Sequence, residues 1–265
     1  MWDEPVVFAD PVALSILGLD AATVRAARAS EENPGSRALR AFLAARSRFA
    51  EDALAAAIER GMRQYVILGA GLDTFAYRSP HRKGTLPVFE VDHPATQAWK
   101  RECLAAAQVA EPPSLTFVPV DFAHQDLTAR LGASGFDRAE PAFFSWLGVS
   151  MYLAPEVVLN TLRSLYAMNP GNAVAFDYAV SPAMHDPYRP SFDALSARVA
   201  RAGEPFRGFF EPAALTAELR SIGYGAIEDL DAEQINARYF SPRSDGLRVR
   251  GSAHLMCAAG GDSLS

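Results

Sequence analysis

Three small residues and a later carboxylate have the spacing of a ligand site. Gly69, Ala70 and Gly71 follow directly after a short apolar run. Small residues after a strand let the backbone turn sharply and approach a ligand closely. Asp92 ends the next apolar run, about 20 residues further on, a spacing at which a carboxylate reaches ribose hydroxyls in dinucleotide-binding folds. Two structural alternatives stay open, namely a plain tight turn at the glycines and a helix cap at Asp92.

The third glycine of the dinucleotide pattern is missing. In G-x-G-x-x-G it would fall at position 74, which is Thr74. A pyrophosphate cofactor favours the complete pattern at a helix N-terminus. S-adenosylmethionine has no phosphate but has a ribose, so the two-glycine turn with Asp92 favours it over NAD. An NAD-dependent oxidoreductase is the first alternative.

The elements that must position these residues alternate between strands and helices. A long amphipathic helix is predicted over Arg37–Arg60. Strands and helices then alternate, which predicts an α/β fold with a mostly parallel sheet covered on both faces. The predicted strands are Tyr65–Leu68, Leu86–Asp92, Leu115–Val120, Ala142–Leu147, Ala173–Tyr178 and Ser252–Ala258. One helix is predicted to begin near Pro94, and three more are predicted over Pro155–Met168, Ser191–Ala202 and Pro212–Ile222.

An ordered set of motifs resembles the leucine carboxyl methyltransferase family. Tyr65–Arg78 is similar to the first motif of its bacterial branch, a set of S-adenosylmethionine-dependent methyltransferases that includes polyketide carboxyl methyltransferases. The resemblance covers about residues 35–258. It implies a class I methyltransferase fold, which is Rossmann-like with about seven mostly parallel strands, and S-adenosylmethionine as cofactor. The further matching stretches are Ala45–Phe49, Val88–Pro94, Ser145–Leu153 and Phe209–Pro212.

The resemblance also implies which residues bind the cofactor along the strand ends. The glycine turn would shape the pocket for the methionine end, Asp92 would hold the ribose, and His93 would lie beside it. Asp121 and Phe122 would flank the adenine, because a carboxylate accepts amino protons and an aromatic ring can stack. The alternative for Asp121 and Phe122 is a turn that ends a strand and buries the phenylalanine.

Arg46 resembles the family arginine that clamps the methionine carboxylate. A guanidinium fork matches a carboxylate with two parallel hydrogen bonds. Arg48 lies about 200° further around the same helix, so both cannot face one small pocket, and either could instead lie on a solvated helix face. Some family members have a glutamate after the fourth strand, whereas this chain has Trp146 and Leu147. We expect Leu147 to contact the cofactor through backbone groups.

The acceptor of the methyl group determines whether a base is needed. A carboxylate, with a pKa of about 4, is already ionised at neutral pH, whereas an alcohol or phenol would need a base such as histidine. His93 and His185 are the candidates. Tyr152 is expected to orient the substrate or to pack beneath a lid formed by residues 181–210. Candidate acceptor-pocket residues in that segment are Phe192, Phe206, Phe209, Phe210, Arg189 and Arg207.

Composition limits the class of protein. We expect one domain over residues 1–265, with an N-terminal helical segment over 1–60. The net charge of −6 argues against a nucleic-acid partner. No run of about 18 apolar residues and no signal peptide is visible, so we expect a cytoplasmic protein that does not enter membranes. We expect a small-molecule acceptor and no metal, and we make no prediction of oligomeric state. A non-catalytic descendant that binds a metabolite or a partner is the second alternative, because the acid near Leu147 is missing.

Overall fold

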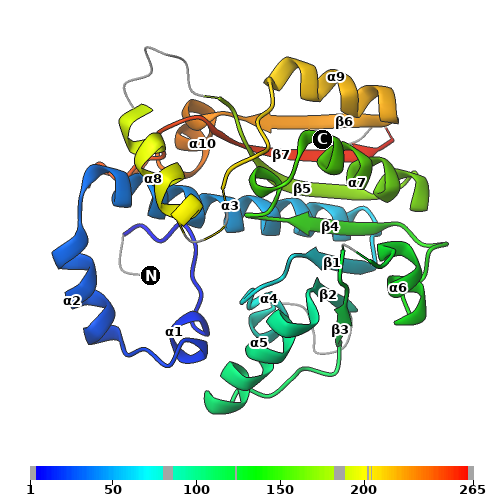
Figure 1. The fold of residues 1–265 in the computed structure, drawn as a ribbon, viewed down its shortest axis with the longest axis horizontal. Helices are drawn as coiled ribbons and strands as arrows, with labels where there is room; N and C mark the ends of the chain where they lie inside the picture. The colour runs from blue at the N-terminus through cyan, green and yellow to red at the C-terminus, as the bar shows by residue number, and fades with distance from the viewer. Residues whose placement is uncertain are drawn as a thin grey trace.

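Seven strands form a single sheet in the described part of the chain. The computed structural model describes residues 4–79, 86–122, 124–181, 189–201, 203 and 205–261. The strand order is β3-β2-β1-β4-β5-β7-β6, and Figure 1 shows the strands fanning from β6 at the top to β3 at the bottom. The strands are β1 (Gln64–Leu68), β2 (Val88–Asp92), β3 (Leu115–Pro119), β4 (Ala142–Trp146), β5 (Ala173–Ala179), β6 (Tyr224–Leu230) and β7 (Ala253–Gly260).

The direction of strand progression reverses between β1 and β4. Strands β1 to β5 pair in parallel, whereas β7 is antiparallel to both β5 and β6. In open α/β sheets, ligands bind in the crevice outside the carboxyl ends of the strands at such a reversal. The residues that follow Leu68 and Trp146 are therefore placed at the position where a ligand is expected.

Alternating apolar side chains along the strands bury both faces of the sheet. In β1, Tyr65 and Ile67 enter one core cluster, while Val66 and Leu68 enter the other. Helix α3 packs against β4, β5 and β7 on the first face, and α7 contacts α9 beside the second (Figure 1). The helices are α1 (Ala13–Ile16), α2 (Ala21–Glu31), α3 (Pro34–Glu59), α4 (Phe75–Arg78), α5 (Pro94–Ala106), α6 (Leu127–Ala133), α7 (Pro155–Met168), α8 (Arg189–Arg201), α9 (Pro212–Ile222) and α10 (Ala232–Tyr239), with a 3₁₀ turn η1 (Ser150–Tyr152).

The start of α3 has strong local signals. The side chain of Asn33 accepts hydrogen bonds from the backbone of Gly35 and Ser36, and the Ser36 hydroxyl accepts one from the Asn33 backbone in return. Proline at the first helical position adds a preset backbone angle. The buried stripe that includes Phe42, Ala45 and Phe49 then holds one face of α3 against the sheet.

The structure confirms the predicted α/β class, the mostly parallel sheet and the six strands predicted individually. Strand β6 was missed because it is a partly exposed edge strand that contains Gly225, Glu228 and Asp229. It therefore has no apolar run of the kind that indicates a buried strand. Within the described ranges, no helix combines the length and the hydropathy that crossing a bilayer requires.

The core on the second face gives a stability prediction. Phe144 is fully buried in β4, so Phe144→Ala should lower the free energy of unfolding by about 3–5 kcal/mol, because it leaves a cavity. Val157→Ala on α7 is the control, since that side chain is 48% exposed. Denaturant titration measures both, and a loss below about 1 kcal/mol for Phe144→Ala would contradict the packing described here.

Candidate active site

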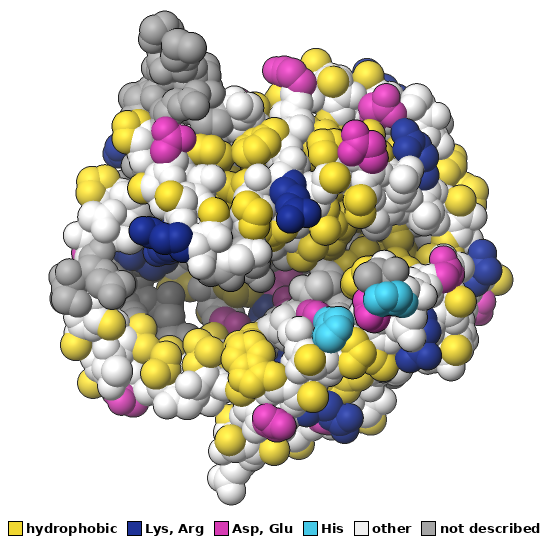
Figure 2. Space-filling model, in the orientation of Figure 1, with side chains coloured by type: hydrophobic (Ala, Val, Ile, Leu, Met, Phe, Trp, Pro, Cys, Tyr) yellow, Lys and Arg dark blue, Asp and Glu magenta, His cyan; other side chains and the backbone are white. Residues whose placement is uncertain are grey.

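A cavity of about 980 Å³ lies at the carboxyl ends of β1 and β4. Figure 2 shows the molecule hollowed on this face, below the position of α8 in Figure 1. The walls come from α3, from the loop after β1, from the turn after β4 and from α8. The cavity brings together six of the predicted site residues, which are Arg46, Gly69, Ala70, Gly71, Leu147 and Tyr152.

The glycine turn has a backbone that other residues would not adopt easily. Gly69 has a φ of +65°, and a Cβ on it would lie 2.6 Å from Cγ2 of Val149. Gly71 has a φ of +47°, and its N–H donates a 2.6 Å hydrogen bond to Oδ2 of Asp92. The turn therefore combines a left-handed backbone with close packing. The hydrogen bond to Asp92 connects it to the end of β2.

Asp92 is held rigidly beside the cavity. Its two carboxylate oxygens accept hydrogen bonds from the backbone of Gly71 and His93, each at 2.6 Å. Asp92 and His93 are not among the residues that line the cavity. His93 instead caps α5, because its Nδ1 accepts a hydrogen bond from the N–H of Ala95. The cofactor contacts of both residues stay predictions.

Asp121 and Phe122 follow β3, one strand beyond Asp92, and they also lie outside the cavity lining. The Asp121 carboxylate is 2.9 Å from Nδ1 of His124. The side chain of Phe122 is not buried as the structural alternative requires, because it is 56% exposed. An exposed aromatic ring at a strand end is available for stacking on a flat ligand.

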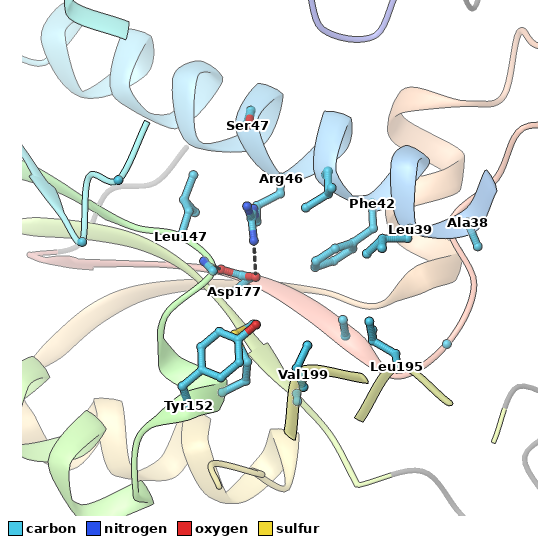
Figure 3. Close-up of a pocket in the computed structure, with 18 of the residues that line it drawn as sticks. Ala38, Leu39, Phe42, Arg46, Ser47, Leu147, Tyr152, Asp177, Leu195 and Val199 are labelled. Carbon is cyan, nitrogen blue, oxygen red and sulfur yellow. Dashed lines mark hydrogen bonds and ion pairs between the residues drawn. The ribbon is translucent and has the colours of Figure 1, made fainter. Parts of the chain in front are cut away.

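Arg46 extends from α3 toward β5, and its partner there is Asp177 (Figure 3). Its Nη1 is 3.1 Å from Oδ2 of Asp177, a carboxylate with no exposed surface, whose Oδ1 accepts a 2.6 Å hydrogen bond from the N–H of Gly148. The Nε of Arg46 is buried and has no partner among the described residues. The guanidinium is thus anchored at one nitrogen, while the side chain as a whole stays 20% exposed and lines the cavity.

Arg48 lies on a different face of α3, as its position on the helix predicts. Its side chain is 51% exposed and forms an ion pair of 2.7 Å with Asp52. It does not line the cavity.

Three carboxylates line the cavity that were not predicted as site residues, namely Asp10, Asp73 and Asp177. Asp177 had a visible signal, because it is the one acid in the otherwise apolar run of β5. Asp10 had none, since it comes from the N-terminal segment, for which no contact with the site was predicted. Its Oδ2 accepts a 2.6 Å hydrogen bond from the hydroxyl of Thr74, which in turn accepts one from Nε of Arg78.

The far part of the cavity is apolar. Leu39 and Phe42 on α3 face Leu195 and Val199 on α8, with Tyr152 beside them (Figure 3). We call these five residues the apolar lobe. Two of the predicted aromatic residues, Phe192 and Phe206, also line the cavity, and their ring centroids are 5.8 Å apart.

The expectation that Phe209 and Phe210 line the cavity is wrong. Phe210 packs against the buried ring of Tyr178, and Phe209 bridges by its backbone to Ala179. Arg207 is exposed and also absent from the lining. The candidate base His185 and the side chain of Arg189 lie outside the described residues, as does much of the segment before α8 that was predicted to form a lid.

The contact between Gly148 and Arg46 gives a second prediction. Gly148 and Gly246 both have a φ of +73°, so alanine should cost about 1–2 kcal/mol of backbone strain at either position. A Cβ on Gly148 would also lie 2.7 Å from Nη1 of Arg46, whereas a Cβ on Gly246 would meet nothing within 4 Å. Gly148→Ala should therefore destabilise the protein more than Gly246→Ala does. When Arg46→Ala is also present, the two glycine variants should lose equal amounts of unfolding free energy. Unfolding measurements in which Gly148→Ala still loses more would refute the contact.

Comparisons with known proteins identify the family of this chain. The sequence model of the family described as leucine carboxyl methyltransferase matches residues 2–166. A Bacillus subtilis (strain 168) protein described as "Putative S-adenosyl-L-methionine-dependent methyltransferase YktD" is 37% identical over 222 residues, which are 81% of this chain and 71% of that protein. A similarly described protein of Mycobacterium sp. (strain JLS) is 39% identical over 140 residues, which are 52% of this chain. The match spans only 45% of that mycobacterial protein.

Solved structures share the fold at low sequence identity. A duf574 family protein from Streptomyces avermitilis has a TM-score of 0.57 at 17% identity, with 97% of this chain and 99% of that chain covered. A structure from Nostoc punctiforme, described as "a putative O-methyltransferase", has a TM-score of 0.50 at 11% identity and covers 79% of this chain and 56% of that chain. The fold is that of class I methyltransferases. The family model matches more than half of this chain, and the chain therefore belongs to the leucine carboxyl methyltransferase family.

Proposed function

We propose that this chain is an S-adenosylmethionine-dependent O-methyltransferase that methylates a carboxylate on a small molecule with an apolar body, such as a polyketide-like metabolite. Family membership supports the reaction class, and the related proteins named above support the cofactor. The observation that carries the proposal is that one cavity joins the charged groups around Arg46 to the apolar lobe. A cofactor and an acceptor can therefore bind side by side.

The charged end of the cavity suits the methionine part of the cofactor. That part has a carboxylate, an ammonium and a sulfonium. The partly exposed guanidinium of Arg46 offers positive charge and donors to the carboxylate, while Asp73 and Asp177 contribute negative charge close to the cationic groups. Gly69 and Gly71 allow the backbone to approach the ligand closely. Arg46 is the first residue we assign to cofactor binding.

The dimensions of the cavity suit two ligands. Pockets for one drug-sized molecule measure roughly 300–1,000 Å³. At about 980 Å³ the cavity is at the upper end of that range, which leaves room for a small acceptor beside the cofactor. The acceptor would lie in the apolar lobe, with Tyr152 as the polar group that orients it.

The chemistry favours an acceptor that is already ionised. In the transfer, an acceptor oxygen attacks the methyl carbon, the carbon–sulfur bond breaks, and its electrons remain on sulfur, which becomes a neutral thioether. A carboxylate needs no base for this step at neutral pH. No histidine is present among the described residues that line the cavity, and histidine is the commonest base for deprotonating an alcohol. Alignment of the two reactants and exclusion of water would supply most of the rate.

The cofactor assignment can be tested with two arginines on one helix. Arg46→Ala should weaken binding of S-adenosylmethionine by about 1.5–3 kcal/mol, because a charged hydrogen-bond donor is lost. Arg48→Ala should leave the dissociation constant unchanged, since that side chain points to solvent and pairs with Asp52. Isothermal titration calorimetry measures both. Equal affinities of wild type and Arg46→Ala would remove Arg46 from the site, and binding of NAD without S-adenosylmethionine would refute the proposal.

The acceptor assignment can be tested by filling the apolar lobe. Leu195→Trp should raise the KM for a carboxylate acceptor without changing cofactor affinity, because the larger ring occupies acceptor space. Ala197→Trp on the exposed side of α8 is the matched control. Assays with labelled cofactor and matched pairs of acids and alcohols would identify the acceptor group. Transfer to the alcohols alone would contradict the carboxylate assignment.

A further inference from the structure

A fully buried ion pair lies directly behind the loop that follows β1. Nζ of Lys100 on α5 is 2.5 Å from Oε2 of Glu90 on β2, and each side chain is 1% exposed. Neither residue lines the cavity. No role was predicted for either residue from the sequence.

This pair is a costly way to hold two elements together. Burial of two charges removes their hydration, and well-packed apolar residues at such positions often stabilise a protein as well or better. The second carboxylate oxygen of Glu90 has no hydrogen-bond partner among the described residues. Burial raises the pKa of Glu90 to about 7 although Lys100 opposes the rise. The link between β2 and α5 also exists without the pair, because Nε2 of Gln97 donates to the carbonyl of Glu90.

Lys100 makes one contact that an apolar residue cannot make. Its Nζ also donates a 2.5 Å hydrogen bond to the backbone carbonyl of Asp73. Asp73 lies between Gly71 and Thr74, and it lines the cavity. The N–H of Asp73 donates to the carbonyl of Ala70, so Asp73 is already part of the hydrogen-bonded turn. Lys100 therefore adds a second restraint to the same turn. The ammonium thereby fixes where the backbone of this loop stands relative to the cavity.

We infer that Lys100 is a positioning residue for cofactor binding, which acts through the carbonyl of Asp73 and is itself held in place by Glu90. This inference rests on the proposed function, since the loop matters only if the cofactor binds against it. Lys100 touches neither reactant. Its effect should therefore appear in the affinity for S-adenosylmethionine and not in the KM for the acceptor.

Two variants separate positioning from stability. Lys100→Met should weaken S-adenosylmethionine binding about tenfold, because a charged hydrogen bond to the loop is lost, and should also lower Tm, because Glu90 is left buried without a partner. The double variant Glu90→Gln/Lys100→Met removes both charges. It should recover most of the loss in Tm while cofactor affinity stays low. Recovery of affinity together with Tm would overturn the inference and leave the pair a purely structural role.

A third variant controls for general loosening of α5. Leu104 is buried on the same helix and does not contact the loop carbonyl, so Leu104→Ala should lower Tm with little change in cofactor affinity. Calorimetric titration with S-adenosylmethionine and thermal unfolding are the two measurements. A wild-type protein that does not bind the cofactor would refute the proposed function. A wild type that binds and a Lys100→Met variant that binds equally well would refute this inference alone.

Discussion

The ion pair between Arg46 and Asp177 is the contact on which the geometry of the cavity depends. It joins α3 to β5 and, through the second oxygen of Asp177, to the backbone of Gly148 after β4. Arg46 and Asp177 are 131 residues apart in the sequence, and the contact therefore depends on the packing of α3 across β4 and β5. The pair is partly desolvated, so it is screened less by salt than a surface pair would be. It therefore fixes the position of the Arg46 guanidinium at the charged end of the cavity.

Three hydrogen bonds to charged side chains restrain the loop after β1. Asp92 holds the N–H of Gly71, Asp10 holds the hydroxyl of Thr74, and Lys100 holds the carbonyl of Asp73. Each contact comes from a different element, and each involves a charged side chain. A loop of small residues has high conformational entropy when unfolded, and these contacts offset part of the cost of ordering it. Because the loop is already ordered, less free energy is lost in ordering it when a ligand binds.

Local patterns in the sequence predicted most of the fold, whereas contacts between distant residues escaped it. The apolar runs of β1, β2, β4 and β5 are almost wholly buried, so their signal is strong, but β6 lies at an edge with mixed polarity and was missed. The glycine turn and Asp92 were predicted because their spacing follows from one β-α-β unit. Asp10 could not be predicted, because its contact with Thr74 joins residues 64 positions apart and depends on where the N-terminal segment folds. Phe210 was misassigned because an aromatic residue near a site packs equally well against a core, whereas the ring of Phe209 packs against Phe192 of the lining without lining the cavity itself.

The two ends of the cavity are built from parts of the molecule that differ in their tolerance to substitution. The charged end depends on buried strands, left-handed glycines and paired charges, where a single substitution disturbs several contacts at once. The apolar lobe is lined in part by Leu195 and Val199 on α8, a helix outside the sheet whose side chains are only half-buried. Substitutions there cost little folding energy. In evolutionary terms, the range of acceptors can diverge between relatives by drift on one helix, while selection for folding alone keeps the other end unchanged.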